Sequence, residues 1–337
     1  MFRKIIPFYL VTLVLIPLFF PSVSQASSSS CYNINQNSKT LINVPVANIW
    51  KDTSAKRTID QNTLTKVVDM KSWTSKMSTT EFRKWLVGKL ETQALYGSEV
   101  KVLKTSGSWV QVAVKDQGTP KNKYGYPGWM PKSQISKQKG DFTECNIASV
   151  KAKTANLYDD KRKKFLEVSF NTRLPVIKEE KAWVQVMIPS NKRKWMKKKD
   201  LHLYSSLANI PKPKGNDLVQ TGKTFLGLPY LWAGISAYGF DCSGFTYSIY
   251  QYHGITIPRD AADQAKQGKF VYKSKLKPGD LLFFAYEKGK GRVHHVGMYV
   301  GNGKMIHSPN SGKNIEMVSI HISPFKEEYA GARRYIK

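Results

Sequence analysis

Alternation of apolar and polar residues dominates the middle of the chain, and it occurs twice in the same order. The matching segments are Val46–Trp50 with Thr154–Tyr158, Trp109–Val114 with Trp183–Ile188, and Trp129–Met130 with Trp195–Met196. Period-two alternation between turns rich in Gly, Asn, Asp and Lys is typical of half-buried strands. The repeat therefore predicts two small all-β barrels in tandem.

The first repeat is longer than the second, and the additional residues fall near 57–92. In that stretch Phe82, Trp85, Leu86 and Leu90 recur at the spacing of a helix. We therefore expect the first barrel, over 27–142, to contain a helical insertion, and the second to span 143–206. The following segment 207–215 contains two prolines and a glycine, which predicts a linker into a third domain over 207–337.

A continuous apolar run, Ile5–Phe20, follows Arg3 and Lys4 near the N-terminus and precedes the small residues Ser24-Gln25-Ala26. This is the pattern of a secretion signal, which we expect over 1–26 with cleavage after Ala26. A membrane span is the alternative, but the run contains two prolines and is shorter than the roughly 20 apolar residues that a spanning helix needs. We expect a secreted, wall-associated protein without stable membrane insertion.

The formal net charge of +29 indicates an anionic partner. Nucleic acid is the usual partner of such a basic chain, but export favours the anionic polymers of a bacterial wall, and simple solubility is the alternative. Three cysteines, Cys31, Cys145 and Cys242, allow at most one disulfide. An exported chain could join Cys31 to Cys145, which the sequence leaves open, and a monomer is the default expectation.

The surroundings of Cys242 differ from those of the other two cysteines. It precedes apolar residues at Phe245, Ile249 and Tyr252, so the spacing predicts a helix that begins at the cysteine, with Asp241 as its N-cap. The positive end of a helix macrodipole favours a thiolate, which is the nucleophilic form. A small buried cysteine without chemistry is the alternative.

Two histidines favour the chemical interpretation. His295 and His307 lie on predicted strands on either side of Gly301-Asn302-Gly303. A cysteine peptidase needs a base for the thiol proton and a third polar group that orients this base. The two histidines share a face of the hairpin only if the loop has three residues, so that 300 pairs with 304 and 297 with 307. We therefore expect that loop.

Asp241-Cys242-Ser243-Gly244, the segment from His295 to Gly301, and His307 together resemble the NlpC family of papain-like wall peptidases. The resemblance covers roughly 215–337 and implies an α+β domain, with Cys242 as nucleophile, His295 as general base and His307 as its orienting partner. His294 is the alternative base. The tandem barrels are similar to bacterial SH3-like domains, so the expected fold class is an α+β papain-like domain behind two SH3-like barrels.

The same resemblance implies further site residues. Tyr230 would help to hold the oxyanion, and Asp241, Trp232 and Ser243 would lie along the substrate groove. Asp260 would receive the free amine of the substrate. The next residue is Ala261, where relatives often have serine, which removes one hydrogen bond to the substrate.

The complete layout resembles the γ-D-glutamyl-L-diamino acid endopeptidases, which cut between D-glutamate and the diamino acid of peptidoglycan stem peptides. In that group a tyrosine of the first barrel closes the groove, so that a free N-terminal L-alanine is required. Tyr126 is the candidate here and Tyr124 its neighbouring alternative. The sequence leaves open whether the diamino acid is diaminopimelate or lysine, and whether intact wall or released fragments are cut.

Two other functions remain open on the sequence. An N-acetylmuramoyl-L-alanine amidase or an acyl transferase would use the same cysteine and histidine, and a wall-binding protein without activity would need only the basic barrels. No zinc-type spacing of Cys and His and no phosphate-binding glycine loop occurs in the sequence. We therefore expect no metal or nucleotide cofactor.

Overall fold

The computed structural model describes residues 1–2, 31, 38–54 and 56–336. The secretion signal expected over 1–26 and its cleavage site therefore lie outside the described residues, apart from the first two positions. In the part of the chain that is described, no helix has the length and apolar character needed to cross a membrane. The residues from Cys31 onward form one compact unit.

Seven strands form the first barrel: β1 (Lys39–Ile42), β2 (Val46–Trp50), β3 (Leu90–Leu95), β4 (Val100–Ser106), β5 (Trp109–Val114), β6 (Tyr126–Pro131) and β7 (Ile135–Gln138). Five of them make a sheet in the order β3-β2-β6-β5-β4, and β1 pairs with β7. In β5 the side chains of Val110, Val112 and Val114 are buried, as the period-two pattern predicts, and the small side chain of Ala113 is buried as well.

The additional residues of the first barrel lie between β2 and β3 and form η1 (Thr58–Thr63), α1 (Met70–Lys76) and α2 (Thr80–Lys84). Both α-helices begin at a capping side chain, since Asp69 accepts from the backbone N–H of Ser72 and Thr79 from that of Phe82. The helical spacing is interrupted, because Phe82 is exposed and Leu90 already belongs to β3.

The second barrel consists of β8 (Ile147–Val150), β9 (Thr154–Tyr158), β10 (Lys164–Ser169), β11 (Arg173–Glu179), β12 (Trp183–Met187), β13 (Arg193–Lys197) and β14 (Leu201–Tyr204). Its strand pairing repeats that of the first barrel. Trp50 of β2 lies opposite Trp129 of β6, and Tyr158 of β9 lies opposite Trp195 of β13. The internal repeat of the sequence is therefore a repeat of three-dimensional pairing.

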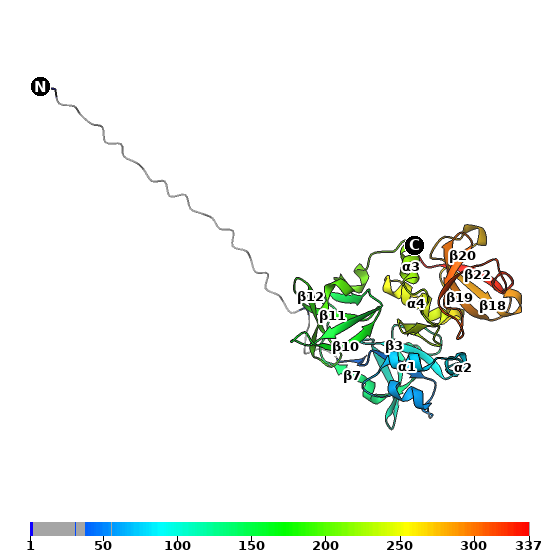
Figure 1. Ribbon diagram of the computed structural model, residues 1–337, viewed down its shortest axis with the longest axis horizontal. Helices are drawn as coiled ribbons and strands as arrows, with labels where there is room; N and C mark the ends of the chain where they lie inside the picture. The colour runs from blue at the N-terminus through cyan, green and yellow to red at the C-terminus, as the bar shows by residue number, and fades with distance from the viewer. Residues whose placement is uncertain (3–30, 32–37, 55, 337) are drawn as a thin grey trace. The chain divides into compact units, whose positions relative to one another are not determined.

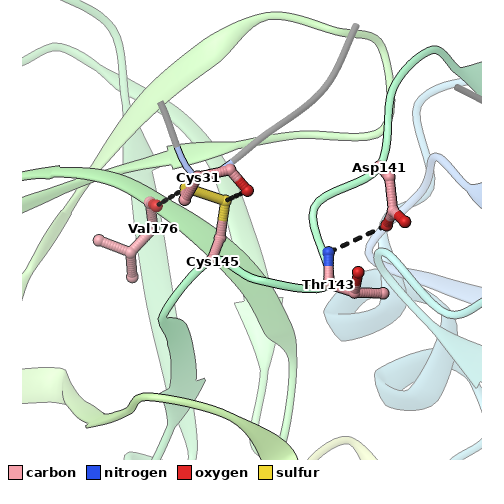
Figure 2. Close-up of a disulfide and its surroundings, with 5 residues drawn as sticks. All are labelled: Cys31, Asp141, Thr143, Cys145 and Val176. Carbon is pink, nitrogen blue, oxygen red and sulfur yellow. Dashed lines mark hydrogen bonds between the residues drawn. A yellow bond between two sulfur atoms is a disulfide. The ribbon is translucent and has the colours of Figure 1, made fainter. Parts of the chain in front are cut away.

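A disulfide joins Cys31 to Cys145, which precedes β8 (Figure 2). It lies beside Val176 of β11, and the nearby turn is held by the Asp141 carboxylate, which accepts from the backbone N–H of Thr143 at 3.0 Å (Figure 2). The bond attaches the chain ahead of the first barrel to the second barrel. The pairing that the sequence left open is therefore present.

The third domain combines helices with a six-stranded antiparallel sheet and a small two-stranded one, in which β15 (Ile235–Ser236) pairs with β16 (Gly239–Phe240). Its main helices are α3 (Gly215–Lys223) and α4 (Cys242–Tyr252), with the shorter α5 (Ala261–Gln264), α6 (Tyr286–Gly289) and α7 (Phe325–Glu328). The six-stranded sheet has the order β17-β22-β18-β19-β20-β21. Its strands are β17 (Lys269–Val271), β18 (Leu281–Ala285), β19 (Val293–Gly301), β20 (Lys304–His307), β21 (Glu316–Ser319) and β22 (Tyr329–Arg334). Helix α4 packs against β19 (Figure 1), which is the expected α+β arrangement.

The hairpin between β19 and β20 reaches the expected register by a different turn. Tyr299 lies opposite Met305 and Met298 opposite Ile306, as in the three-residue loop that was expected. Near the turn, however, Gly301 pairs with Lys304, and the register shifts between 299 and 301. Asn302 and Gly303 both have positive φ, at 51° and 65°, which is the requirement of a two-residue type I′ turn. A bulge supplies the extra residue.

The first barrel meets the third domain through β3. The Trp232 indole N–H donates to the Leu90 carbonyl at 2.8 Å, and the Gln93 side-chain oxygen accepts from the Ile235 backbone N–H at 3.2 Å. Gln93 itself is fully buried. Because a buried amide needs its hydrogen bonds, this contact fixes the position of the first barrel beside α4.

Candidate active site

Cys242 is the first residue of α4, and Asp241 is the N-cap. The Asp241 carboxylate accepts from the backbone N–H of Gly244 at 2.5 Å. A Cβ on Gly244 would lie 2.0 Å from the Gly234 carbonyl oxygen, so this turn of the helix can pack only around glycine. The motif Asp-Cys-Ser-Gly is therefore a structural requirement for placing the thiol at the helix start.

The thiol of Cys242 is free and half-buried. The backbone N–H groups of Val296 and Ser243 lie near its sulfur, and Val296 directly follows His295 on β19. Burial raises the pKa of the Cys242 thiol to about 12, and the Asp241 carboxylate adds to this increase. Burial thus opposes the thiolate that the helix start was expected to favour.

His295 and His307 form a buried pair. Nε2 of His295 lies 2.8 Å from Nδ1 of His307, and the two residues are 7% and 1% exposed. Burial lowers the pKa of His295 well below its ordinary value, and neighbouring His307 and His294 lower it further. Burial lowers the pKa of His307 to about 3, with a smaller contribution from Lys313. Both imidazoles are neutral at neutral pH.

Close packing places the two histidines on the same face of the hairpin. A Cβ on Gly297 would meet the Met305 sulfur at 2.6 Å and the His307 Cβ at 3.3 Å. His294, the alternative base, points elsewhere: its Nε2 lies 3.1 Å from a Glu328 carboxylate oxygen, and its ring stacks on Tyr286. The geometry thus favours His295 over His294.

The buried guanidinium of Arg259 binds the residues at the start of α4. Arg259 is 1% exposed, and it donates to both carboxylate oxygens of Asp241, at 3.1 and 2.6 Å. It also donates to the Ser243 hydroxyl at 3.0 Å and to the Thr92 hydroxyl of β3 at 3.0 Å. Asp241 and Ser243 are therefore engaged in a buried network, and their place along the substrate groove stays a prediction.

Tyr230 and Trp232 were both expected beside the nucleophile. Burial raises the pKa of Tyr230, and the residue lies near enough to Cys242 for a thiolate there to raise it further. It is a candidate donor to an oxyanion at this position. Trp232 uses its N–H for the Leu90 carbonyl, so its polar group serves the contact between domains.

The two barrel tyrosines have different surroundings. The Tyr126 hydroxyl donates to the Asp260 carboxylate at 2.9 Å, and the residue is 2% exposed. Tyr124 is 45% exposed. Asp260 stands at the N-cap of α5 but makes no capping hydrogen bond with its side chain, so the carboxylate faces the tyrosine. Burial raises the pKa of Asp260, although Arg259 and Lys121 oppose this increase.

Lys121 completes this cluster. Its ammonium group lies 2.7 Å from the Glu91 carboxylate and 3.9 Å from that of Asp260, and it stands 4.3 Å from the centre of the Tyr126 ring. The two carboxylates and one ammonium leave one negative charge, which suits a cationic ligand. The sequence singled out Asp260 and Tyr126 but not Glu91, Lys121 or the role of Arg259, since no local pattern connects residues so far apart in the chain.

This arrangement can carry out nucleophilic acyl transfer. The hydrogen bond between the histidines occupies Nε2 of His295, which leaves Nδ1 to accept the thiol proton. The first N–H groups of a helix have no partner within it. At the start of α4 the Asp241 carboxylate accepts from that of Gly244, which leaves the earlier ones to stabilise a developing oxyanion. In the described part of the chain, no group of three or more His, Cys, Asp or Glu side chains is arranged to hold a metal ion.

Three family models match separate parts of the chain. The NlpC/P60 family matches residues 227–334, the YKFC SH3b2 domain matches 150–204, and the bacterial dipeptidyl-peptidase SH3 domain matches 88–135. These regions correspond to the third domain, the second barrel and part of the first.

Two relatives extend over most of the chain, and both are named γ-D-glutamyl-L-lysine dipeptidyl-peptidase. The protein from Bacillus cereus is 47% identical and covers 89% of this chain and 92% of its own length. The protein from Bacillus subtilis is 43% identical and covers 86% of this chain and 96% of its own length. A crystal structure of an NlpC/P60 family protein from Bacillus cereus has a TM-score of 0.85 and 46% identity, and it covers 89% of this chain and 100% of that one.

Proposed function

Because the chain belongs to the NlpC/P60 family and is a cysteine peptidase, we propose that it hydrolyses the bond between γ-D-glutamate and the diamino acid of peptidoglycan stem peptides. The observation that carries this proposal is the Tyr126–Asp260 hydrogen bond, which joins the first barrel to the catalytic domain. Asp260 directly follows Arg259, which binds the Asp241 cap beside the nucleophile. An acidic group at a closed end of the groove suits a substrate with a free amine. The names of the two relatives support the same bond.

The catalytic steps use the groups already described. His295 accepts the thiol proton at Nδ1 while the Cys242 sulfur bonds to the γ-carbonyl carbon, and the displaced electron pair moves to the oxygen. Collapse of this intermediate breaks the C–N bond, and His295 returns the proton to the leaving amine. Water then attacks the thioester with His295 again as base, which releases the γ-carboxylate product and restores the thiol.

Recognition of the amino end rests on charge and closure. The ammonium group of an N-terminal L-alanine would contact Asp260, with the Tyr126 ring closing the space beyond it. Ala261 offers no hydroxyl to this end of the substrate. An amidase would have to admit a glycan where Tyr126 stands, so this contact favours a peptidase for released peptides over the amidase alternative. A wall-binding protein without activity would not require the buried histidine pair.

We propose that residues 1–26 direct export and that the protein works outside the cytoplasmic membrane as a monomer. The excess of lysine and arginine would attract the mature protein to anionic wall polymers over a range set by ionic strength. Sedimentation with purified wall at low and high salt tests this attraction, which should weaken as salt is added.

The activity is tested with L-Ala-γ-D-Glu-L-Lys and its diaminopimelate counterpart, each with a free or an acetylated N-terminus. Mass spectrometry should detect L-Ala-γ-D-Glu from the free peptides, and Cys242→Ala should release none. We expect acetylation to lower kcat/KM by about 100-fold or more, because Asp260 then faces a neutral amide in a buried site. Comparison of kcat/KM for the lysine and diaminopimelate peptides shows which diamino acid the enzyme prefers.

Asp260→Asn is the matched variant, since it keeps the shape of the site and removes the charge. It should lower kcat/KM for the free peptide and leave the acetylated peptide nearly unchanged. If the wild type leaves the tripeptides intact but strips stem peptides from intact glycan, the amidase alternative is correct. Equal cleavage of free and acetylated peptides would remove the proposed role of Asp260 and Tyr126.

A further inference from the structure

Whether His295 can accept the thiol proton depends on which ring nitrogens of His295 and His307 are protonated. One hydrogen bond joins His295 Nε2 and His307 Nδ1, and either nitrogen can be the donor. If His295 donates, its Nδ1 carries no proton and can accept that of the thiol. If His307 donates, neutral His295 carries its proton on Nδ1 and cannot act as the base. The first arrangement requires that neutral His307 be protonated at Nε2.

The protonation of His307 at Nε2 therefore decides whether His295 can act as the base. This nitrogen is buried, and among the described residues it has no hydrogen-bond partner. A buried donor without an acceptor is costly, so the competent tautomer needs an acceptor nearby. A Glu316 carboxylate oxygen lies 3.7 Å from this nitrogen, which is beyond an ordinary hydrogen bond but close enough for electrostatic attraction.

Strand pairing fixes this approach. Glu316 begins β21 and lies directly opposite His307 in the register with β20, a position in which side chains of neighbouring strands meet. The titratable groups around His307 are His295 from β19, Glu316 from β21 and Lys313 from the preceding loop. Lys313 lies 3.2 Å from the same Glu316 oxygen. From α7 the uncharged ring of Phe325 packs on His307.

We propose that Glu316 is a positioning residue for catalysis: its carboxylate, which can only accept a hydrogen bond, holds His307 in the tautomer protonated at Nε2. Through the 2.8 Å contact, this choice places the proton of His295 on Nε2 and keeps Nδ1 ready for the thiol. The same carboxylate offsets the positive charge that His295 gains when it accepts the thiol proton. This inference rests on the cysteine peptidase chemistry and not on the substrate proposed above.

Glu316→Met tests the proposal, because methionine keeps the length of the side chain but replaces the carboxylate with an uncharged thioether, which is only a weak acceptor. Nitrogen-15 NMR of histidine distinguishes protonated from unprotonated ring nitrogens and needs no substrate. In the wild type, His307 Nε2 and His295 Nε2 should carry the protons, whereas Glu316→Met should give a mixture of tautomers. We expect kcat to fall about tenfold with KM nearly unchanged, by analogy with partners that orient catalytic or metal-bound histidines.

Three comparisons separate this role from a structural one. Glu316→Gln keeps an oxygen that accepts, so it should restore most of the wild-type tautomer and kcat. Met317→Ala alters an exposed neighbour on the same strand and should change neither. If Glu316→Met does not fold, Glu316→Ala carries the same test. Unchanged histidine tautomers in Glu316→Met or Glu316→Ala would overturn the proposal, whether or not kcat falls.

If the tripeptides prove not to be substrates, alkylation of Cys242 by iodoacetamide at neutral pH replaces the peptidase assay. The rate should fall in Glu316→Met together with the change in tautomer. An unchanged rate would contradict the inference without bearing on the cell-wall substrate. Loss of tripeptide cleavage with normal alkylation and tautomers would instead contradict only the proposed function.

Discussion

The resting thiol and imidazole of the active site are both neutral, for the same physical reason. Burial penalises the charged form of each group, so it raises the pKa of Cys242 to about 12 and lowers that of His295 well below its usual value. Both shifts oppose a preformed thiolate–imidazolium pair at rest. Proton transfer must accompany attack on the substrate, when the bound peptide has displaced water and the oxyanion donors are engaged.

This protonation state predicts the pH dependence of alkylation. A thiol whose pKa is raised is protonated at neutral pH, so the thiolate fraction of Cys242 should rise about tenfold per pH unit from pH 7 to 10. Iodoacetamide rates measured over that range should rise without a plateau. Denatured protein with its disulfide intact is the control, since its thiol should level off above an ordinary pKa of about 8.5. A plateau below pH 8 in the native protein would indicate an ion pair instead.

At the scale of elements, the start of α4 depends on one residue from outside the helix. Arg259 pairs with both oxygens of the Asp241 cap and reaches Thr92 on β3. A buried charge that loses its partner is far more destabilising than the pair was stabilising. The guanidinium of Arg259 thus binds both the start of α4, which carries the nucleophile, and β3 of the first barrel.

Arg259→Met should therefore lower the free energy of unfolding by about 3–5 kcal/mol, because it leaves the Asp241 carboxylate buried and unpaired. Urea denaturation followed by circular dichroism measures this change. Adding Asp241→Asn should recover part of the loss, since the amide oxygen can still cap the helix while the charge is gone. A double variant no more stable than the single one would show that the unpaired charge is not the cause.

At the scale of the whole molecule, the disulfide closes a long loop. Cys31 and Cys145 are 114 residues apart, and the first barrel lies between them. Restricting so long a segment in the unfolded chain stabilises the folded state in the loop-entropy picture. We expect replacement of both cysteines by serine to cost about 2–4 kcal/mol, seen as a lower melting temperature.

The alkylation rate of Cys242 should be the same with and without the disulfide, because the bond contacts the second barrel and not α4 or β19. Treatment of the wild type with a reductant is the matched comparison and should give the same melting temperature as the double serine variant. A reduced protein that melts at the wild-type temperature would mean that the bond adds no stability.

The sequence by itself determined the features that depend on near neighbours. The strands of both barrels follow from alternation, the helix at Cys242 follows from its cap and apolar spacing, and the hairpin that brings His295 to His307 follows from a glycine turn. Their register was predicted correctly even though the turn itself was not, because a bulge and a three-residue loop shift the strands equally.

Only the tertiary structure decided how these local parts act on one another. The Tyr126–Asp260 contact joins residues 134 positions apart, and the Arg259–Thr92 contact joins residues 167 apart. A helix dipole can be inferred from the sequence, whereas the burial that opposes the thiolate of Cys242 depends on how the folded chain packs around the thiol. Spacing along the chain encodes local geometry, but desolvation and long-range pairing arise from the folded packing.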